Sequence, residues 1–406
     1  MPEASPPPLA SQRPPEADLL FLTARFHMPA EMEARVRWLV RHPVNWIGLI
    51  RLASQHETIA LLYRNLQRLC PDELPSDARE ALAALCRERE KEARERTEEL
   101  VRILGVLEDR GVFAVAYKGT VLAKRLYGDL SLRDFSDHSD LDIMIHRRDL
   151  AMAQQVILQQ GYRLALPLRS EFDEYVRTHR ELDFRRDRGG PRMLELHWRF
   201  SVLPACVRQD PERFLKRFEM LSLAGARVRS LPLEVYVLVL SMHAAKHKWK
   251  KLKLICDIAE ILQIPGVDWE CVVREADHLG LRRILAVSVL LAQDPLDVQI
   301  PEVLKSRLKI DPMAHTVAKE CREALLDEPD EDWRKEEGYD FFSRIRERLS
   351  DRARMFLQFR LLPRFTPDQR DRRIVRVPDS LSAFYYLVRP ARMAWEKITG
   401  RELSAE

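Results

Sequence analysis

Two aspartates separated by one residue are the first feature of this sequence that suggests chemistry. Asp140 and Asp142 lie in the run Asp-Leu-Asp-Ile-Met, which predicts a β-strand. Alternate side chains of a strand share a face, about 6.6–6.8 Å apart along the chain. Two carboxylates at that spacing repel each other unless a cation lies between them, and hard oxygen ligands suit Mg²⁺. The motif therefore predicts a site for one or two divalent cations, as in two-metal phosphoryl transfer.

A metal pair normally requires a third carboxylate, and two later residues are candidates. Glu195 lies in a predicted strand, where Glu195 and His197 share one face. Asp183 lies in the preceding predicted strand. We favour Glu195, because a Glu-x-His pair is the less ordinary pattern. His197 is interpreted either as a substrate contact or as a core histidine with satisfied hydrogen bonds.

A glycine-centred turn precedes the aspartates. Lys118-Gly119-Thr120 follows a predicted strand and opens a predicted helix. Glycine lets the backbone approach a phosphate closely, and the helix N-terminus offers free N–H groups. Lys118 adds a charge and Thr120 a hydroxyl donor. Arg133, in the loop that follows, is either a phosphate-binding guanidinium or a solvated loop charge.

The elements that position these residues form an α+β segment, at residues 111–203. We expect two helices in it, over residues 120–127 and 147–160, the second closed by Gly161. Strands are expected over residues 112–117, 140–146, 162–166, 181–186 and 192–199.

Helical regions flank this segment. Residues 1–16 are proline-rich and predict a disordered tail. Residues 17–110 predict helices that end in one long charged helix over 76–110, interpreted as a solvated face. Only helices are expected in the domain at 204–330, among them a long one over 233–263. The remaining residues, 331–406, predict a helical and irregular tail.

Basic and histidine-containing patterns in the region after residue 204 have two interpretations each. His243 and His247 are spaced as i and i+4 on one helix, which suits zinc or a structural role, and we prefer the structural role because no matched third ligand appears. The basic run from His247 to Lys253 is either a solvated face or a binding surface for a triphosphate.

Composition excludes several classes of protein. The chain has 406 residues, and 67 basic against 63 acidic side chains leave a net charge of +4, which argues against a dedicated nucleic-acid coat protein. The six cysteines form no C-x-x-C pair, which indicates a reducing compartment. The N-terminus has no apolar signal region, and no run reaches about 18 apolar residues. We therefore expect a cytoplasmic protein without a membrane span.

The order of these motifs resembles the nucleotidyltransferase superfamily that includes DNA polymerase β and kanamycin nucleotidyltransferase. Its members share a strand, a turn of small residues, a helix, a D-x-D strand led by Ser or Thr, and a later strand with one acid. Here Ser139 leads the D-x-D strand. The superfamily turn is commonly Gly-Ser or Gly-Gly, whereas this chain has Gly119-Thr120, which keeps the hydroxyl and adds a methyl group.

More closely, the chain resembles a bacterial family of uncharacterised nucleotidyltransferases, from about residue 20 to 395. The residues that carry this resemblance are Lys118-Gly119, Arg133, Asp140-Leu141-Asp142-Ile143-Met144, Gly161-Tyr162, Glu195-Leu196-His197-Trp198, His243, Trp249, Asp257 and the segment Phe384–Pro390.

The resemblance implies a polymerase β-like α+β core and an enzyme that moves a nucleoside monophosphate from an NTP, such as ATP, to an acceptor hydroxyl or phosphate with release of pyrophosphate. Asp140, Asp142 and Glu195 would bind Mg²⁺ or Mn²⁺ and act in catalysis. The residues expected at the nucleotide are Lys118, Gly119, Thr120, Arg133, Ser139 and His197.

The acceptor is an unidentified small molecule or protein, since the near-neutral charge argues against long nucleic acid. Two alternatives stay open. One is a catalytically degenerate module of this fold that binds nucleotide or a partner protein. The other is a helical scaffold whose function lies in residues 17–110 and 205–330.

Overall fold

The computed structural model of the chain describes residues 13–134, 140–165, 179–187, 193–200, 211–326, 337–361 and 384–399, with the single residues 172, 175 and 176. The chain divides into two compact units. The first comprises residues up to 329 without 203–207, and the second contains the helices after residue 330. No helix in these described segments is long and apolar enough to cross a membrane.

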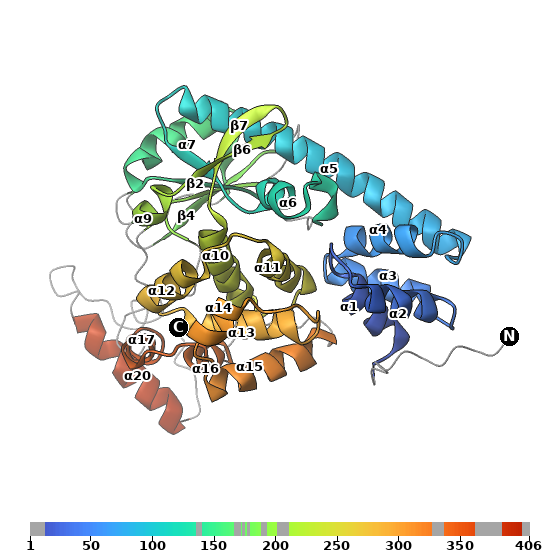
Figure 1. Cartoon of the computed structure of the whole chain (residues 1–406). Coiled ribbons are helices and arrows are strands. Elements are labelled where there is room, and N and C mark those ends of the chain that lie inside the picture. Colours follow the sequence, from blue (N-terminus) through green and yellow to red (C-terminus); the bar gives the residue numbers. More distant parts are fainter. Residues whose placement is uncertain are drawn as a thin grey trace. The chain divides into compact units, whose positions relative to one another are not determined.

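A seven-stranded mixed sheet lies in the first unit (Figure 1). In spatial order its strands are β3 (Arg163–Leu164), β4 (Glu181–Arg185), β5 (Met193–His197), β2 (Leu141–Ile145), β1 (Ala114–Ala116), β7 (Ala226–Ser230) and β6 (Glu219–Leu223). β2 pairs with β5 in parallel and with β1 antiparallel. The strand that follows Asp140 is therefore enclosed on both sides, and the chain has the α+β character that its sequence predicts.

Alternation along three adjacent strands gives the sheet one apolar and one charged face. The residues of β2, β5 and β4 that enter the hydrophobic core are Leu141, Ile143, Ile145, Leu194, Leu196, Leu182 and Phe184. The residues between them point to the opposite face, because successive side chains of a strand alternate. That face carries Asp142, Glu195 and Asp183.

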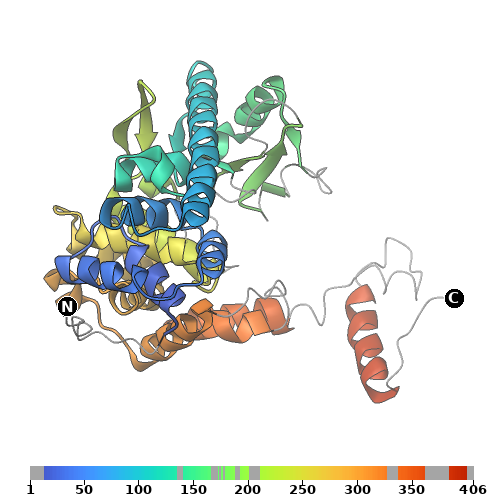
Figure 2. The same cartoon turned by 90° about the vertical axis from the view of Figure 1, so that its right-hand side faces the viewer.

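Helix α5 (Ser76–Glu108) covers the apolar face of the sheet. Leu100, Ile103, Leu104 and Leu107 follow helical spacing and are buried in the same core as the strands. Figures 1 and 2 both show α5 running from the N-terminal helices along the sheet. The single long helix is confirmed, but its interpretation as a solvated face is wrong for the second half, where this stripe packs against the strands.

In the sequence, the other helices of the first unit precede the strands of the sheet, lie between them or follow them. They are α1 (Pro15–Thr23), α2 (Ala30–Val40), α3 (Trp46–Gln55), α4 (Ile59–Leu69), α6 (Gly119–Tyr127), α7 (Leu150–Gln159), α9 (Pro211–Leu215), α10 (Leu233–Lys246), α11 (Leu252–Gln263), α12 (Trp269–Leu279), α13 (Arg282–Gln293), α14 (Glu302–Arg307) and α15 (Pro312–Glu323). The second unit contains α16 (Glu337–Arg344), α17 (Leu349–Phe356) and α20 (Tyr385–Thr399).

Two sequence-based expectations for the region after residue 204 are wrong. The region contains strands as well as helices, because β6 and β7 form a hairpin around Ala224-Gly225 and β7 joins β1 of the sheet. The helix expected over 233–263 is two helices. Its break contains Lys248 and Trp249, both with positive φ (50° and 52°), and the Trp249 side chain is fully buried.

Candidate active site

The charged face of the sheet gathers acidic side chains around one histidine. Asp142 of β2 lies opposite Glu195 of β5, and Glu195 lies opposite Asp183 of β4. His197 lies opposite Glu181. The D-x-D motif and the Glu-x-His motif therefore meet on neighbouring strands, as the alternation of each predicts.

His197 connects three of these carboxylates. Its ring is fully buried, with Nε2 3.1 Å from Asp142 Oδ1 and 3.0 Å from Glu195 Oε2. Its Nδ1 is 3.1 Å from Glu181 Oε2. Burial alone would lower the pKa of His197, but the close contacts with these carboxylates raise it well above 6.5. These contacts favour the imidazolium, which balances part of the negative charge of the acidic cluster.

Lys118 supplies a second internal cation. Its Nζ donates to Asp142 Oδ1 at 2.9 Å and lies 4.7 Å from the centre of the Tyr117 ring. Burial would raise the pKa of Asp142, but Lys118 and His197 lower it. Lys118 has φ 64°, a strained conformation for a residue with a side chain, and such strain is concentrated at functional sites.

Asp140 lies directly before β2, and its pKa shifts in the opposite direction from that of Asp142. Burial, then the charge of Glu195 and a hydrogen bond shared with it, raise the pKa of Asp140. Asp142 and Asp183 add like charge. The cluster thus holds more negative charge than Lys118 and His197 can balance, which is the condition under which a bound cation stabilises it.

A pocket opens beside the D-x-D motif, where strand β1 passes into helix α6. It is lined by Arg96, Leu100, Tyr117, Lys118, Gly119, Thr120, Asp140, Leu141 and Asp142. The Thr120 hydroxyl is buried here without a hydrogen-bond partner among the described residues. The first N–H groups of α6 start at the same place, and a helix N-terminus attracts anions. The predicted phosphate cradle and two of the three predicted metal ligands, Asp140 and Asp142, therefore line one pocket.

The donor atoms fit a divalent cation. Ligand atoms of Asp142, Glu195 and His197 all lie within 4.8 Å of one another, and so do those of Glu181, Asp183 and Glu195. Carboxylate oxygens suit Mg²⁺. Glu195 belongs to both groups, whereas Asp183 belongs to one of them. Glu195 is thus placed beside the D-x-D motif, and the competing candidate Asp183 lies one strand farther away.

Arg133, which was expected at the nucleotide, has other surroundings. Ser139 lies outside the described residues. Arg133 is buried and donates to Asp257 of α11, with Nε 3.1 Å from Oδ1 and the terminal nitrogen 2.9 Å from Oδ2. Tyr127 of α6 donates to the same carboxylate. These contacts favour a structural role for Arg133, and its nucleotide-binding role stays a prediction.

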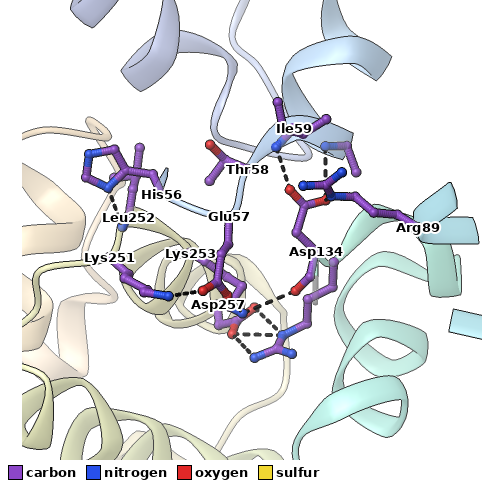
Figure 3. Close-up of polar contacts among 12 residues, drawn as sticks. His56, Glu57, Thr58, Ile59, Arg89, Asp134, Lys251, Leu252, Lys253 and Asp257 are labelled. Atoms are coloured by element: carbon purple, nitrogen blue, oxygen red, sulfur yellow. Dashed lines mark hydrogen bonds and ion pairs between the residues drawn. The ribbon is translucent and has the colours of Figure 1, made fainter. Parts of the chain in front are cut away.

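The basic run after His247 is not a solvated face throughout (Figure 3). Lys251 and Lys253 both pair with Glu57, in the turn between α3 and α4, and Lys253 is buried. Figure 3 shows Asp134 close by, where it accepts from the N–H of Ile59 at 2.6 Å. These contacts join the N-terminal helices, the loop before the D-x-D motif and α11, and they leave Lys253 directed at Glu57.

His243 and His247 do not form a metal site with any third ligand in the described part of the chain. Their rings pack edge to face with centres 4.8 Å apart. Burial lowers the pKa of both, that of His247 to about 4. The structural interpretation of this pair is favoured over zinc binding.

Glu181 is the site residue that the sequence analysis missed. A usable signal was present, because Glu181 and Asp183 have the same i, i+2 spacing as Asp140 and Asp142 and lie on a predicted strand. Burial would raise the pKa of Glu181, but the close contact with His197 and its charge lower it to about 2. Glu181 is therefore ionised and oriented toward the ring.

A comparison with family models matches residues 42–297, more than half of the chain, to a family described as uncharacterised nucleotidyltransferases. The chain belongs to this nucleotidyltransferase family. The match includes the Lys118-Gly119-Thr120 turn, the D-x-D strand, the Glu-x-His strand and helices α10 to α13. No curated protein matches the chain significantly.

Proposed function

We propose that the protein is a metal-dependent nucleotidyltransferase with a polymerase β-like core, which transfers NMP from an NTP such as ATP to a small-molecule or protein acceptor. The convergence of Asp140, Asp142 and Glu195 beside an anion-attracting pocket carries this proposal. A catalytically degenerate module is not favoured, since the three acids and the turn occur together.

Each part of the site has a role in this reaction. Lys118, the Thr120 hydroxyl and the first N–H groups of α6 bind the triphosphate beside Gly119. Asp140, Asp142 and Glu195 hold Mg²⁺ or Mn²⁺, which supplies charge neutralisation on the phosphate oxygens. The acceptor oxygen forms a bond to the α-phosphorus, the bond from that phosphorus to the bridging oxygen breaks, and pyrophosphate leaves. Asp142 or Glu195 takes the acceptor proton.

The proposal is tested by calorimetric titration of each NTP with and without Mg²⁺, on the wild type and on Asp140→Asn. We expect metal-dependent binding in the wild type and at least about tenfold weaker binding in the variant, because even the loss of a residue that only orients a metal ligand costs about 10–100-fold. Asp187→Asn is the matched control, since Asp187 is exposed and pairs with Arg163. Equal binding by the wild type and Asp140→Asn, or no binding by either, would contradict the proposal.

The acceptor is then sought by incubating the protein with the bound NTP, Mg²⁺ and candidate acceptors. Mass spectrometry should detect an acceptor heavier by one NMP, together with released pyrophosphate. Asp140→Asn supplies the negative control. NTP hydrolysis without any such adduct across sugars, small amines and proteins would count against transfer.

A further inference from the structure

The imidazole of His197 takes no part in the proposed transfer, although its two nitrogens are directed at different carboxylates. Nε2 lies 3.1 Å from Asp142 Oδ1 and 3.0 Å from Glu195 Oε2. Nδ1 lies 3.1 Å from Glu181 Oε2 on the other side of the ring. Because the side chain is fully buried between β4 and β2, this orientation is fixed by the sheet itself.

This arrangement has the form of a metal-binding histidine. Such histidines donate one ring N–H to a carboxylate and bind the ion with the other nitrogen. Ligand atoms at right angles around an ion with bonds of about 2.1 Å are about 3 Å apart. The distances from Nε2 to Asp142 and Glu195 match that spacing. Glu181 lies where the outer carboxylate would be, with Oε2 3.1 Å from Nδ1, although these two atoms do not have hydrogen-bond geometry in this structure.

We propose that His197 Nε2 is a metal ligand together with Asp142 and Glu195, oriented by Glu181, and that this nitrogen makes the site prefer a first-row transition-metal ion such as Mn²⁺ over Mg²⁺. Imidazole suits such ions, whereas Mg²⁺ takes oxygen ligands. The inference rests on the metal dependence in the proposed function and adds a nitrogen ligand and the preference between the two ions.

The direct test is pulsed electron paramagnetic resonance of the full chain loaded with Mn²⁺. A coordinated imidazole gives a ¹⁴N coupling, which should change to the ¹⁵N pattern when the protein contains ¹⁵N-labelled histidine. The coupling should persist in His243→Gln and disappear in His197→Gln. A Mn²⁺-loaded wild type without nitrogen coupling overturns the inference, and this measurement does not depend on whether any variant folds.

Affinities give a second test, with thermal unfolding as the check on folding. In His197→Gln, Mn²⁺ affinity should fall about 10–100-fold, and Mg²⁺ affinity should change much less. Glu181→Ala should also lower the ratio of Mn²⁺ affinity to Mg²⁺ affinity, but by a smaller amount. If His197→Gln loses affinity for Mn²⁺ and Mg²⁺ equally, the inference is overturned.

The two proposals fail in different ways. If the wild type binds neither Mn²⁺ nor Mg²⁺, with or without NTP, the proposed function fails. A different outcome is that both ions bind the wild type, that Asp142→Asn abolishes this binding, and that no nitrogen coupling is seen. In that case the site has only oxygen ligands, and only the proposed role of His197 is wrong.

Discussion

Among single residues, Gly119 shows most directly how backbone conformation and ligand binding are linked. It follows Lys118 at the start of α6 with φ 54°, and no described heavy atom lies within 4 Å of the position that a Cβ would occupy. The space is open on the side of the pocket. A side chain there would strain the backbone and fill the room needed by a phosphate.

Gly119→Ala should therefore lower both stability and NTP affinity. The left-handed conformation costs an L-residue about 1–2 kcal/mol, and the added methyl group blocks the approach of the phosphate. Gly161→Ala is the matched control, because Gly161 has φ 83° and equally open surroundings at the end of α7. Denaturation should show similar destabilisation for both, whereas titration with NTP should show weaker binding for Gly119→Ala alone. Equal NTP affinities of Gly119→Ala and Gly161→Ala would contradict the proposal that a phosphate binds beside Gly119.

At this scale the sequence predicted the D-x-D carboxylates, Glu195 and the lysine turn, because each relies on local alternation or on a local turn. It did not predict the partners that each side chain finds. Arg133 pairs with Asp257, more than 100 residues later, and Lys253 pairs with Glu57. Such pairings depend on how distant segments fold together, which no local pattern encodes.

At the scale of elements, the break between α10 and α11 is held by one side chain. Trp249 is fully buried, and its Nε1 donates to Ser288 Oγ of α13 at 3.0 Å. Neither Lys248 nor Trp249 is a glycine, so the sequence has no local signal for two consecutive residues with positive φ. Burial of the indole overrides the helical propensity that predicted a continuous helix.

Trp249→Ala should destabilise the protein by about 3–5 kcal/mol, as large-to-small changes of buried aromatic residues do. Urea unfolding measures this loss. Ser288→Ala keeps the indole and removes its acceptor, and it should cost about 1 kcal/mol. A loss below about 1 kcal/mol for Trp249→Ala would show that the indole does not hold the break.

At the scale of the whole molecule, the cluster around Glu57 ties together segments from three parts of the first unit. Burial would raise the pKa of Glu57, but Lys253 and Lys251 lower it to about 2. A carboxyl with a lowered folded pKa stabilises the protein above its unfolded pKa of about 4.5. That contribution is lost as the pH falls from about 4.5 toward 2.

Glu57→Gln should accordingly destabilise the protein by about 3–5 kcal/mol at pH 7, since it leaves the charge of Lys253 buried without its paired carboxylate. The difference from wild type in unfolding free energy should shrink as the pH falls below about 4.5. Urea denaturation at pH 7, 5, 4 and 3 checks both. Glu73→Gln, at an exposed pair with Arg41, should cost at most about 1 kcal/mol. If the difference in unfolding free energy between Glu57→Gln and the wild type does not vary with pH, the Glu57 carboxylate does not stabilise the protein in this way.

The placement of β1 between β2 and β7 also determines when the sheet can be completed during synthesis. β1 and β2 are close in sequence, but β7 ends at Ser230, more than 100 residues after β1. A nascent chain that stops before β7 presents β1 as an unpaired edge, and such edges recruit other chains. Contacts of this sequence separation also form slowly. The strands that carry the candidate site are therefore exposed to aggregation until the hairpin has left the ribosome. A fragment that ends at residue 203 should be poorly soluble although it contains every proposed ligand.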